Sequence, residues 1–445
     1  MLMMAILLLT MSISGCGSSQ DTTPEVDAAF IANPDRTLFY GETLTVVVSS
    51  PTMTRPLATQ YMAKNPGVTV EIFSFSDIAN GRNELGVQLM AGSAPVLIEG
   101  SFVDHHDPRT AHFFVDWLPI MNADPNFNED DWFMNVFHAS AVNGQLYAFP
   151  TTFAYETVTA NSTIPGLSEI LTAKDSITLS ALIDIHRETP TDNPLLLDYN
   201  FDTGWVVNFY LDSFMDIETG WVEFNNEQFI NLITYAREVT SLKSEFGEWV
   251  GLVVTFPEQE VYKSERYFFQ ISPSVVYQYF MDFETGPLFT ELTPLVNERG
   301  ELLVNLWGSY VLNANATSVE QALAWDFIQF MMDTDTRREF IEMQPTNRNL
   351  FHLGGEWHVA FRIGHLREFG WPLNSTTSET VEDVIAQQIA HMEMPMGIIR
   401  ALPFAIENII DEALERFHNG LVSAEQTAAD LQNRVTLVLM EMGIN

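Results

Sequence analysis

The chain has 445 residues, and its 59 Asp and Glu against 20 Lys and Arg give a formal net charge of −39. This acidity disfavours a nucleic-acid binder or a binder of phosphorylated polyanions, because both need clustered Lys and Arg. Hydrophobic residues make up 46%, which is enough for a large core and excludes a disordered chain. The length predicts two or three domains of about 100–200 residues each. The single cysteine excludes an intrachain disulfide and a cysteine zinc site.

The sequence opens with an apolar run over residues 2–13. A membrane-spanning helix needs about 20 apolar residues, so this run is too short to span and is typical of a signal peptide. It ends in ISGC (residues 13–16), which resembles the lipobox of bacterial lipoproteins. We therefore expect a signal peptide over 1–15, a lipidated Cys16 and a lipid-anchored flexible tether over 16–41. The anchor would hold the chain outside the cytoplasmic membrane, at the cell surface or in the periplasm. A stray cysteine behind a hydrophobic leader is the alternative.

Residues 44–98 carry an alternating pattern of strands and helices. Strands are predicted at 44–48, 68–72 and 96–98 from β-branched or alternating apolar residues. Between them, one helix is expected to open at Pro56 and to end before 65–67, and a second is expected over 83–92 with Gly92 as its cap. This order predicts parallel βαβ units with helices on the faces of a sheet.

The C-terminal half is predicted to be more helical. Thr317 and Ser318 precede Glu320 and Gln321 in a capping-box arrangement, and a second capping box begins at Ser423. Between them, Pro403 is expected to open a helix that Gly420 ends. The apolar stripes of these helices predict core packing and give no reason to invoke a cofactor.

Five segments resemble family 1 extracellular solute-binding proteins, the substrate receptors of ABC importers for sugars. Residues 143–150 (NGQLYAFP) are similar to the family signature G-x-L-Y-A-x-P. One segment precedes it, at 114–133, and three follow it in the order of the family, at 221–239, 307–340 and 420–432. Two positions depart from the family pattern. Ser213-Phe214 stand for the usual Gly-Gly, and Ala94-Pro95-Val96 lack the usual Asp.

The resemblance implies an α/β, two-lobed periplasmic-binding-protein fold of the type II kind, with a helix-flanked sheet in each lobe and hinge crossings between them. The N-terminal lobe would hold 42–151 plus about 272–315, and the C-terminal lobe 152–271 plus about 316–445. It further implies a monomeric, non-enzymatic binding lipoprotein without a cofactor. Such a protein would capture a carbohydrate, by our expectation a neutral oligosaccharide, by hinge closure. Its partners would be an ABC permease and ATPase, with no nucleic acid and no membrane contact besides the anchor.

Candidate ligand contacts follow from the fold, because ligands bind at the carboxyl ends of strands in such sheets. Aromatic rings can cover the apolar face of a sugar, and carboxylates and hydroxyls can bind its hydroxyl groups. Each ring could instead belong to the core, and Ser49 and Ser50 could simply cap the next helix. The predicted contacts are Ser49, Ser50, Thr52, Phe75, Asp77, Glu99, Ser101, Phe153, Tyr155, Ser272, Tyr277 and Trp307.

Three alternatives stay open. A glycoside hydrolase would need only two suitably spaced carboxylates among the 59 acids. A metal site could use His105, His106 and Asp107 with His112, or 356–358 with His365, although we expect no metal. The same fold could bind a cationic or peptide-like solute, which the net charge would attract.

Overall fold

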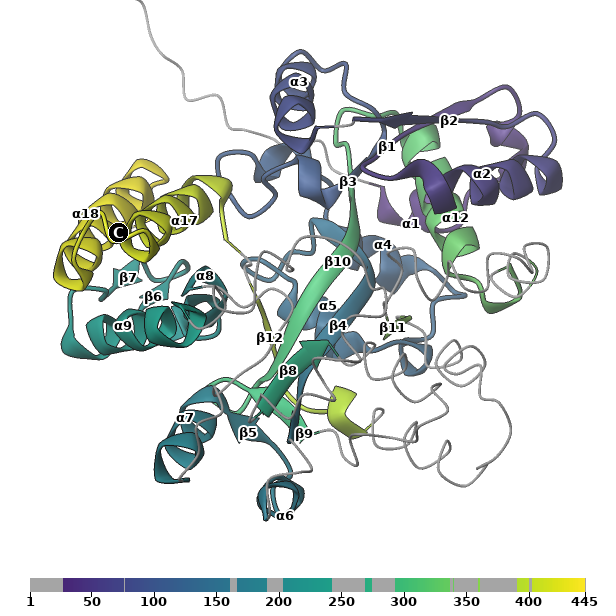
Figure 1. Ribbon diagram of the computed structural model, residues 1–445. Helices are drawn as coiled ribbons and strands as arrows, with labels where there is room; N and C mark the ends of the chain where they lie inside the picture. The colour runs from purple at the N-terminus through teal and green to yellow at the C-terminus, as the bar shows by residue number, and fades with distance from the viewer. Residues whose placement is uncertain are drawn as a thin grey trace, which may run out of the picture.

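In the computed structural model of the chain, the ranges described are 27–75, 77–160, 166–189, 203–241, 269–273, 293–336, 339, 359–360, 390–399 and 402–444. The predicted signal peptide and Cys16 lie outside these residues. Figure 1 shows the arrangement of the elements. Within the described ranges, no helix combines the length and the apolar character needed to cross a membrane.

The first βαβ units form in the predicted order, although the second helix begins at Ile78, five residues before the predicted start. The parallel strands β1 (Thr43–Val48), β2 (Thr69–Ser74) and β3 (Leu97–Glu99) lie in the order β3-β1-β2, and α2 (Pro51–Lys64) and α3 (Ile78–Met90) connect them. The prediction that Pro56 opens a helix is wrong, because α2 begins at Pro51 and Pro56 lies inside it. Proline suits the first helical position because it has no backbone N–H, and an N–H there would have no partner within the helix.

Two long antiparallel strands run through the centre of the molecule (Figure 1), and they join the first three strands to the rest of the sheet. They are β4 (Ala148–Ala160) and β10 (Leu302–Leu312), and β10 also pairs antiparallel with β3. Further strands of this sheet are β5 (Ile177–Thr178), β8 (Phe269–Pro273), β9 (Thr293–Val296), β11 (Val359–Ala360) and β12 (Met396–Ile398). The two long strands are the crossings that connect the lobes.

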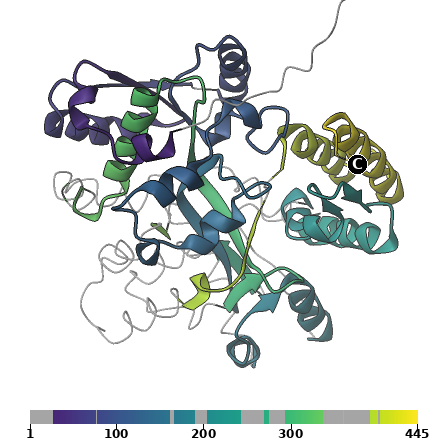
Figure 2. The same ribbon diagram turned by 180° about the vertical axis from the view of Figure 1, so that it is seen from behind.

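Separate hydrophobic cores define two lobes. The first lobe has one core around Val46, Trp117 and Phe149 and a smaller one around Leu85 and Phe102. The second lobe has its own core, built from helices that lie apart from the first lobe in Figures 1 and 2. Those helices and their small hairpin are α6 (Leu167–Thr172), α7 (Leu179–Glu188), α8 (Thr203–Asn208), α9 (Glu227–Ser241), α17 (Phe404–His418), α18 (Ala424–Glu441), β6 (Met215–Asp216) and β7 (Trp221–Val222).

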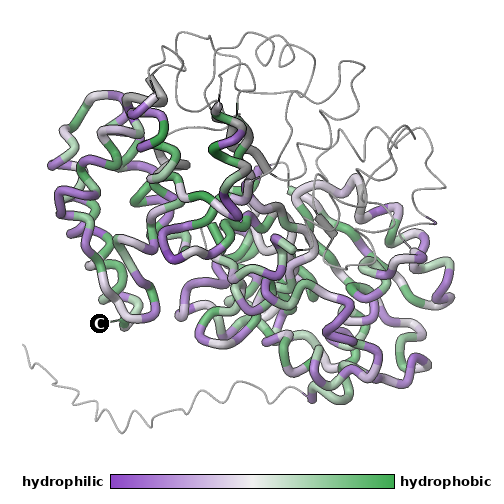
Figure 3. Tube along the Cα trace, turned by 90° about the horizontal axis from the view of Figure 1, so that it is seen from below, coloured by the Kyte–Doolittle hydropathy of each residue, from purple (hydrophilic) through white to green (hydrophobic). Residues whose placement is uncertain are grey.

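The helices of the second lobe are amphipathic. In Figure 3 hydrophobic and hydrophilic positions alternate along the tube that leads to the C-terminus, which includes α17 and α18. In the apolar stripe of α18, Leu431 and Val435 are fully buried in the second core, and Ala424 and Val438 pack against it while partly exposed. Both capping boxes are confirmed, with Thr317 and Glu320 at the start of α12 (Ser318–Met332) and Ser423 and Gln426 at the start of α18.

Two predicted boundaries need correction. We assigned residues after 316 to the C-terminal lobe, but α12 (Ser318–Met332) buries Phe327 in the core of the first lobe. A capping box and an apolar stripe predict a helix, but not which sheet it covers. The tether predicted over 16–41 is also too long, because α1 (Ala28–Ala32) buries Ile31 in the first core.

The remaining short helices belong to the first lobe, except for η5 in the second. They are η1 (Arg36–Phe39), η2 (Gly100–Phe102), η3 (Ala111–Phe113), α4 (Trp117–Ala123), η4 (Glu129–Asp131), α5 (Met134–Ala139) and η5 (Leu211–Ser213).

Candidate functional site

Three predicted contact residues meet at the carboxyl ends of β1 and β3. The Glu99 carboxylate accepts hydrogen bonds from the backbone N–H of Ser49 (2.6 Å), the Ser49 hydroxyl (2.7 Å) and the Ser101 hydroxyl (2.8 Å). All three residues are partly exposed. The parallel pairing of β1 and β3 brings these ends together, as expected for such a sheet. We name Ser49, Glu99 and Ser101 the serine–glutamate cluster.

Ser50 and Thr52 lie next to this cluster, at the start of α2. Ser50 is the N-cap residue of α2, but its side chain makes no capping hydrogen bond. Its hydroxyl lies 3.2 Å from the Thr52 hydroxyl, and Ser50 is exposed. The alternative role of Ser50 as a side-chain cap is therefore not seen in the structure.

The two predicted contacts after β2 have local structural roles. Asp77 caps α3 by accepting a hydrogen bond from the Asn80 N–H at 3.0 Å. The Phe75 ring packs edge-on against Phe102, with 5.6 Å between ring centroids. Gly81 on α3 faces both rings, and a Cβ at that position would collide with them.

The aromatic residues predicted at the first crossing are buried. Phe153 and Tyr155 on β4 are 0% exposed and belong to the first core. The Tyr155 hydroxyl lies 3.4 Å from Nδ1 of His391. Phe153 and Tyr155 are two residues apart, so both rings lie on the same face of β4 and point into the core. In this arrangement of the lobes they are core residues, as the alternative interpretation expected.

The predicted contacts at the second crossing are placed only by their backbone. Ser272 lies on β8 opposite Thr157 of β4, and Trp307 lies on β10. Tyr277 lies outside the described residues.

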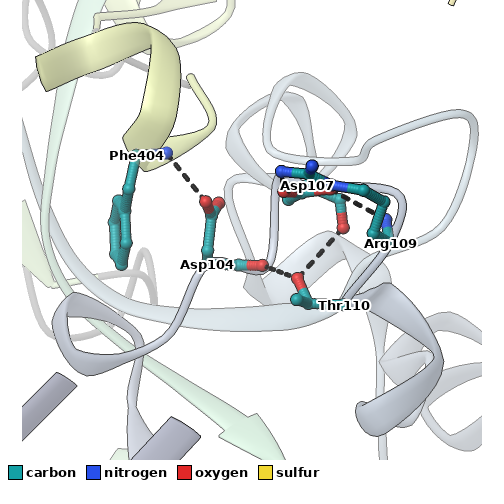
Figure 4. A network of polar contacts seen from close by, with 5 residues as sticks. All are labelled: Asp104, Asp107, Arg109, Thr110 and Phe404. Carbon is teal, nitrogen blue, oxygen red and sulfur yellow. Dashed lines mark hydrogen bonds and ion pairs between the residues drawn. The ribbon is translucent and has the colours of Figure 1, made fainter. Parts of the chain in front are cut away.

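The two lobes touch through a contact that the sequence did not predict (Figure 4). Oδ2 of Asp104, in the loop after β3, accepts a hydrogen bond of 2.8 Å from the backbone N–H of Phe404 at the start of α17. The N-cap residue of α17 is Pro403, which offers no side-chain hydrogen bond. Asp104 therefore satisfies from the first lobe an N–H that the helix itself leaves free, and its charge matches the positive end of the helix dipole.

Arg82 on α3 supports the same contact. Its guanidinium lies 3.7 Å from the centroid of the Phe404 ring, a cation–π distance. The Nε of Arg82 also donates to the backbone carbonyl of Ser101 at 2.9 Å. Arg82 thus links the serine–glutamate cluster to the second lobe. We name Asp104, Arg82 and Phe404 the interlobe contact.

Burial makes Asp104 electrostatically unusual. Desolvation raises the pKa of Asp104 to about 6, although the hydrogen bond from Phe404 acts in the opposite direction. Its Oδ1 atom is buried and has no hydrogen-bond partner in the structure. The loop around it is held by an ion pair between Asp107 and Arg109 (2.5 Å), and the Thr110 hydroxyl donates to the carbonyl of Asp104 (Figure 4).

The neighbouring histidines are neutral above the acid range. His105 and His106 stack with 4.1 Å between ring centroids. Desolvation lowers the pKa of His105 to about 4 and that of His106 well below its ordinary value. Within the ranges that the structure describes, no three His, Cys, Asp or Glu side chains come together as metal ligands. The second predicted set, 356–358 with His365, lies outside those ranges.

A separate hollow of about 220 Å³ lies in the second lobe, beside β12 and the turn between β9 and β10. None of the predicted contact residues lines it. Its wall holds Arg299, which pairs with Asp212 (2.8 Å) and Glu301 (2.9 Å). Burial raises the pKa of Asp212, against the lowering effect of Arg299. These ion pairs connect the β9–β10 turn to η5.

Sequence reasoning thus found the serine–glutamate cluster and missed the interlobe contact. One signal for Asp104 was available, because it is an acidic residue soon after the third strand, at the predicted binding edge. Nothing comparable marked Phe404, which follows a predicted helix start some 300 residues later.

No family model and no curated protein sequence matches the chain. Solved structures do. An ABC transporter solute-binding protein of Agrobacterium radiobacter K84 in complex with ribitol has a TM-score of 0.61 and 13% identity, over 90% of this chain and 99% of that one. The sugar-binding protein MalE of Xanthomonas citri has a TM-score of 0.60 and 13% identity, over 90% of this chain and 98% of that one.

A family 1 extracellular solute-binding protein of Bifidobacterium longum subsp. infantis has a TM-score of 0.57 and 13% identity, over 89% of this chain and 99% of that one. The chain therefore has the two-lobed fold of ABC transporter solute-binding proteins. This finding agrees with the order of the motifs along the sequence and confirms the predicted fold class.

Proposed function

We propose that the chain is the substrate-binding protein of an ABC importer and that it captures a carbohydrate between its lobes. Proteins of the same fold include one solved with ribitol and one described as sugar-binding. These neighbours are binding proteins, which favours capture over the hydrolase alternative.

The observation that carries the proposal is the serine–glutamate cluster at the carboxyl edge of the first sheet. Its two hydroxyls are uncharged polar groups, partly exposed and fixed by short hydrogen bonds to Glu99. Fixed polar groups of this kind orient a ligand and give specificity. Through Arg82 the cluster is linked to the second lobe, so a ligand bound there would lie beside the surface on which the lobes meet.

The interlobe contact supports closure as the capture step. If the lobes separate about β4 and β10, Asp104 and Arg82 would lose their contacts with Phe404, so both contacts would favour the closed arrangement. A ligand that also touches both lobes adds to the same preference, and only this difference in free energy couples binding to delivery. The hinge would be β4 and β10, which pass through both lobes.

The remaining parts of the proposal come from the N-terminal sequence and the fold. Lipidation of Cys16 would anchor the protein outside the cytoplasmic membrane. The shortened tether, before α1, would connect the anchor to the first lobe. The closed, loaded protein would act as a monomer and would dock on a permease dimer with its ATPase.

Thermal shift and calorimetry against a panel of ribitol and neutral mono- to hexasaccharides test this function. We expect at least one panel member to raise the melting temperature and to bind with an affinity that is nearly independent of salt. A polyamine or peptide that binds instead, with affinity falling as salt rises, would favour the cationic alternative that the net charge of −39 supports. Release of reducing sugar during incubation would replace capture with hydrolysis.

A further inference from the structure

Glu99 is surrounded by donors from its own lobe. A carboxylate has about four lone-pair positions, and in this site two hydroxyls and one backbone N–H occupy three of them. Oε1 receives both hydroxyl protons, from Ser49 and from Ser101. Oε2 receives the Ser49 N–H. Glu99 therefore has little capacity left for a ligand of its own.

These bonds fix the direction of the hydroxyl protons. A serine hydroxyl has one proton and two lone pairs, and a carboxylate can only accept. Because Ser49 and Ser101 both donate to Glu99, each can offer only lone pairs to any group that approaches from the exposed side. The backbone N–H of Ser49 cannot reverse, so it also fixes the orientation of the carboxylate.

We propose that Glu99 is a positioning residue that holds the Ser49 and Ser101 hydroxyls as hydrogen-bond acceptors, so that the site selects ligands with hydrogen-bond donors at matching positions. Hydroxyl groups of a carbohydrate meet this requirement, whereas groups that only accept do not. The inference rests on the proposed function, and it names the polarity that the ligand must present.

The surroundings of the cluster are built for close approach. Gly100 follows Glu99, and a Cβ at residue 100 would collide with the hydroxyl of Ser309 on β10. The side chain of His105 lies at the same position, 3.5 Å from that Cβ. Glycine at residue 100 thus lets β10 approach the end of β3, and Arg82 holds the Ser101 carbonyl at 2.9 Å. Both contacts restrain the backbone that carries the two acceptors.

Glu99→Gln tests the proton direction, because its amide group carries both a donor and an acceptor. The Ser49 N–H needs the amide oxygen, so the amide NH2 faces the hydroxyls. A serine hydroxyl that accepts from this NH2 must turn its own proton outward and becomes a donor. The substitution therefore reverses the polarity that the ligand meets, at nearly constant shape.

The probes are glucose, maltose and maltotriose with their single deoxyfluoro derivatives, in which fluorine replaces a hydroxyl and cannot donate. In the wild type, we expect one or two derivatives to bind at least about tenfold more weakly than the parent sugar, because an acceptor is left unpaired. In Glu99→Gln, we expect the ratio of the Kd of each such derivative to the Kd of its parent sugar to fall below about threefold. Glu84→Gln, at an exposed site on α3, is the matched control and should keep the wild-type ratio.

Three outcomes would overturn the inference or its basis. If Glu99→Gln folds and keeps the wild-type ratio at every position, Glu99 does not set the polarity. If Glu99→Gln weakens the binding of every derivative and its parent sugar by the same factor and lowers the melting temperature, the role of Glu99 is only structural. If no sugar, ribitol included, binds the wild type, the proposed function fails and the inference fails with it. Should Glu99→Gln not fold, Ser49→Ala with Ser101→Ala must abolish the ratio in the same way, and a retained ratio counts against the proposal.

Discussion

Two carboxylates at the edge of the first sheet differ in how they are held. Glu99 is satisfied entirely within the first lobe, by donors from Ser49 and Ser101. Asp104 has one oxygen bonded to Phe404 of the second lobe and one buried oxygen without a partner. The first carboxylate is therefore satisfied within one lobe, whereas the second is bonded across both. Under the proposed function, Glu99 would organise the binding surface and Asp104 would hold the lobes closed over it.

Asp104→Ala should have the largest effect on ligand affinity. It removes the hydrogen bond from the Phe404 N–H between the lobes, worth about 0.5–1.5 kcal/mol for the neutral carboxyl that predominates below about pH 6. At pH 5 we expect the Kd for the best panel sugar to rise by about 3–10-fold. Small-angle scattering should show a larger radius of gyration at a given sugar concentration.

Ser423→Ala is the matched control for this change. It removes a helix cap inside the second lobe, at α18, and should cost about 1 kcal/mol of unfolding free energy without changing the Kd. If both variants raise the Kd equally, Asp104 only stabilises the N-terminus of α17 and does not control closure.

Glu99→Ala should instead lower the free energy of unfolding, by about 2 kcal/mol. Three donors lose a charged acceptor, and the Ser49 N–H is left without its partner. Urea denaturation measures the change, and Glu84→Ala on the exposed face of α3 should stay within about 0.5 kcal/mol of the wild type. Equal stabilities for Glu99→Ala and the wild type would contradict the view that this carboxylate organises the edge.

Closure should weaken as the pH rises through about 6. The pKa of Asp104 is raised to about 6 in the closed arrangement and should lie near its ordinary 3.8 when the lobes separate. Closing therefore takes up a proton. The contribution of this proton uptake to ligand affinity is fully present below about pH 4 and is lost above about pH 6. The full shift would correspond to about 100-fold, but Asp104 is partly exposed, so we expect about tenfold.

The charged neighbours of Asp104 act on its pKa in opposite directions. Asp107 raises it and Arg109 lowers it, and these two neighbours form an ion pair with each other. Desolvation lowers the pKa of His105 to about 4 and lowers that of His106 well below its ordinary value. Glu441 on α18 acts on Arg109 at a distance. Asp104→Asn should give a flat affinity between pH 4.5 and 8, and a slope equal to that of the wild type would assign the titration to another group.

Arg82→Ala should have the smallest effect, a rise in Kd of about threefold. It loses a cation–π contact with Phe404, which is worth about 0.5–1 kcal/mol at such sites. Arg237 lies 4.3 Å from the Phe417 ring inside the second lobe, and Arg237→Ala is the matched control with an unchanged Kd. A double-mutant cycle with Phe404→Leu should show coupling for Arg82. Additive effects would mean that the two side chains act independently.

Local signals in the sequence predicted the parts of the fold that are local. The first βαβ units and both capping boxes follow from residue patterns within a few turns of chain. Ser49, Glu99 and Ser101 could be predicted as one group because parallel strands end at one edge of a sheet. The direction of their hydrogen bonds was not predictable, since it depends on side-chain positions.

Features that depend on distant packing could not be predicted. Asp104 and Phe404 are 300 residues apart in sequence, and no pattern in either segment indicates the other. The helix α12 carries clear cap and stripe signals, but its lobe was assigned wrongly because its apolar face would fit either core. Phe153 and Tyr155 follow the crossing as expected, but the pleat of β4 turns both rings inward.

The two hinge strands also determine how the molecule comes apart. On β4, Phe149 lies in the first core and Val158 in the second, and on β10 Leu312 and Leu303 are divided in the same way. Neither lobe contains a complete sheet of its own. A chain divided between the lobes would therefore leave each fragment with strands that lack their neighbours. Heating should therefore unfold both lobes in one cooperative transition.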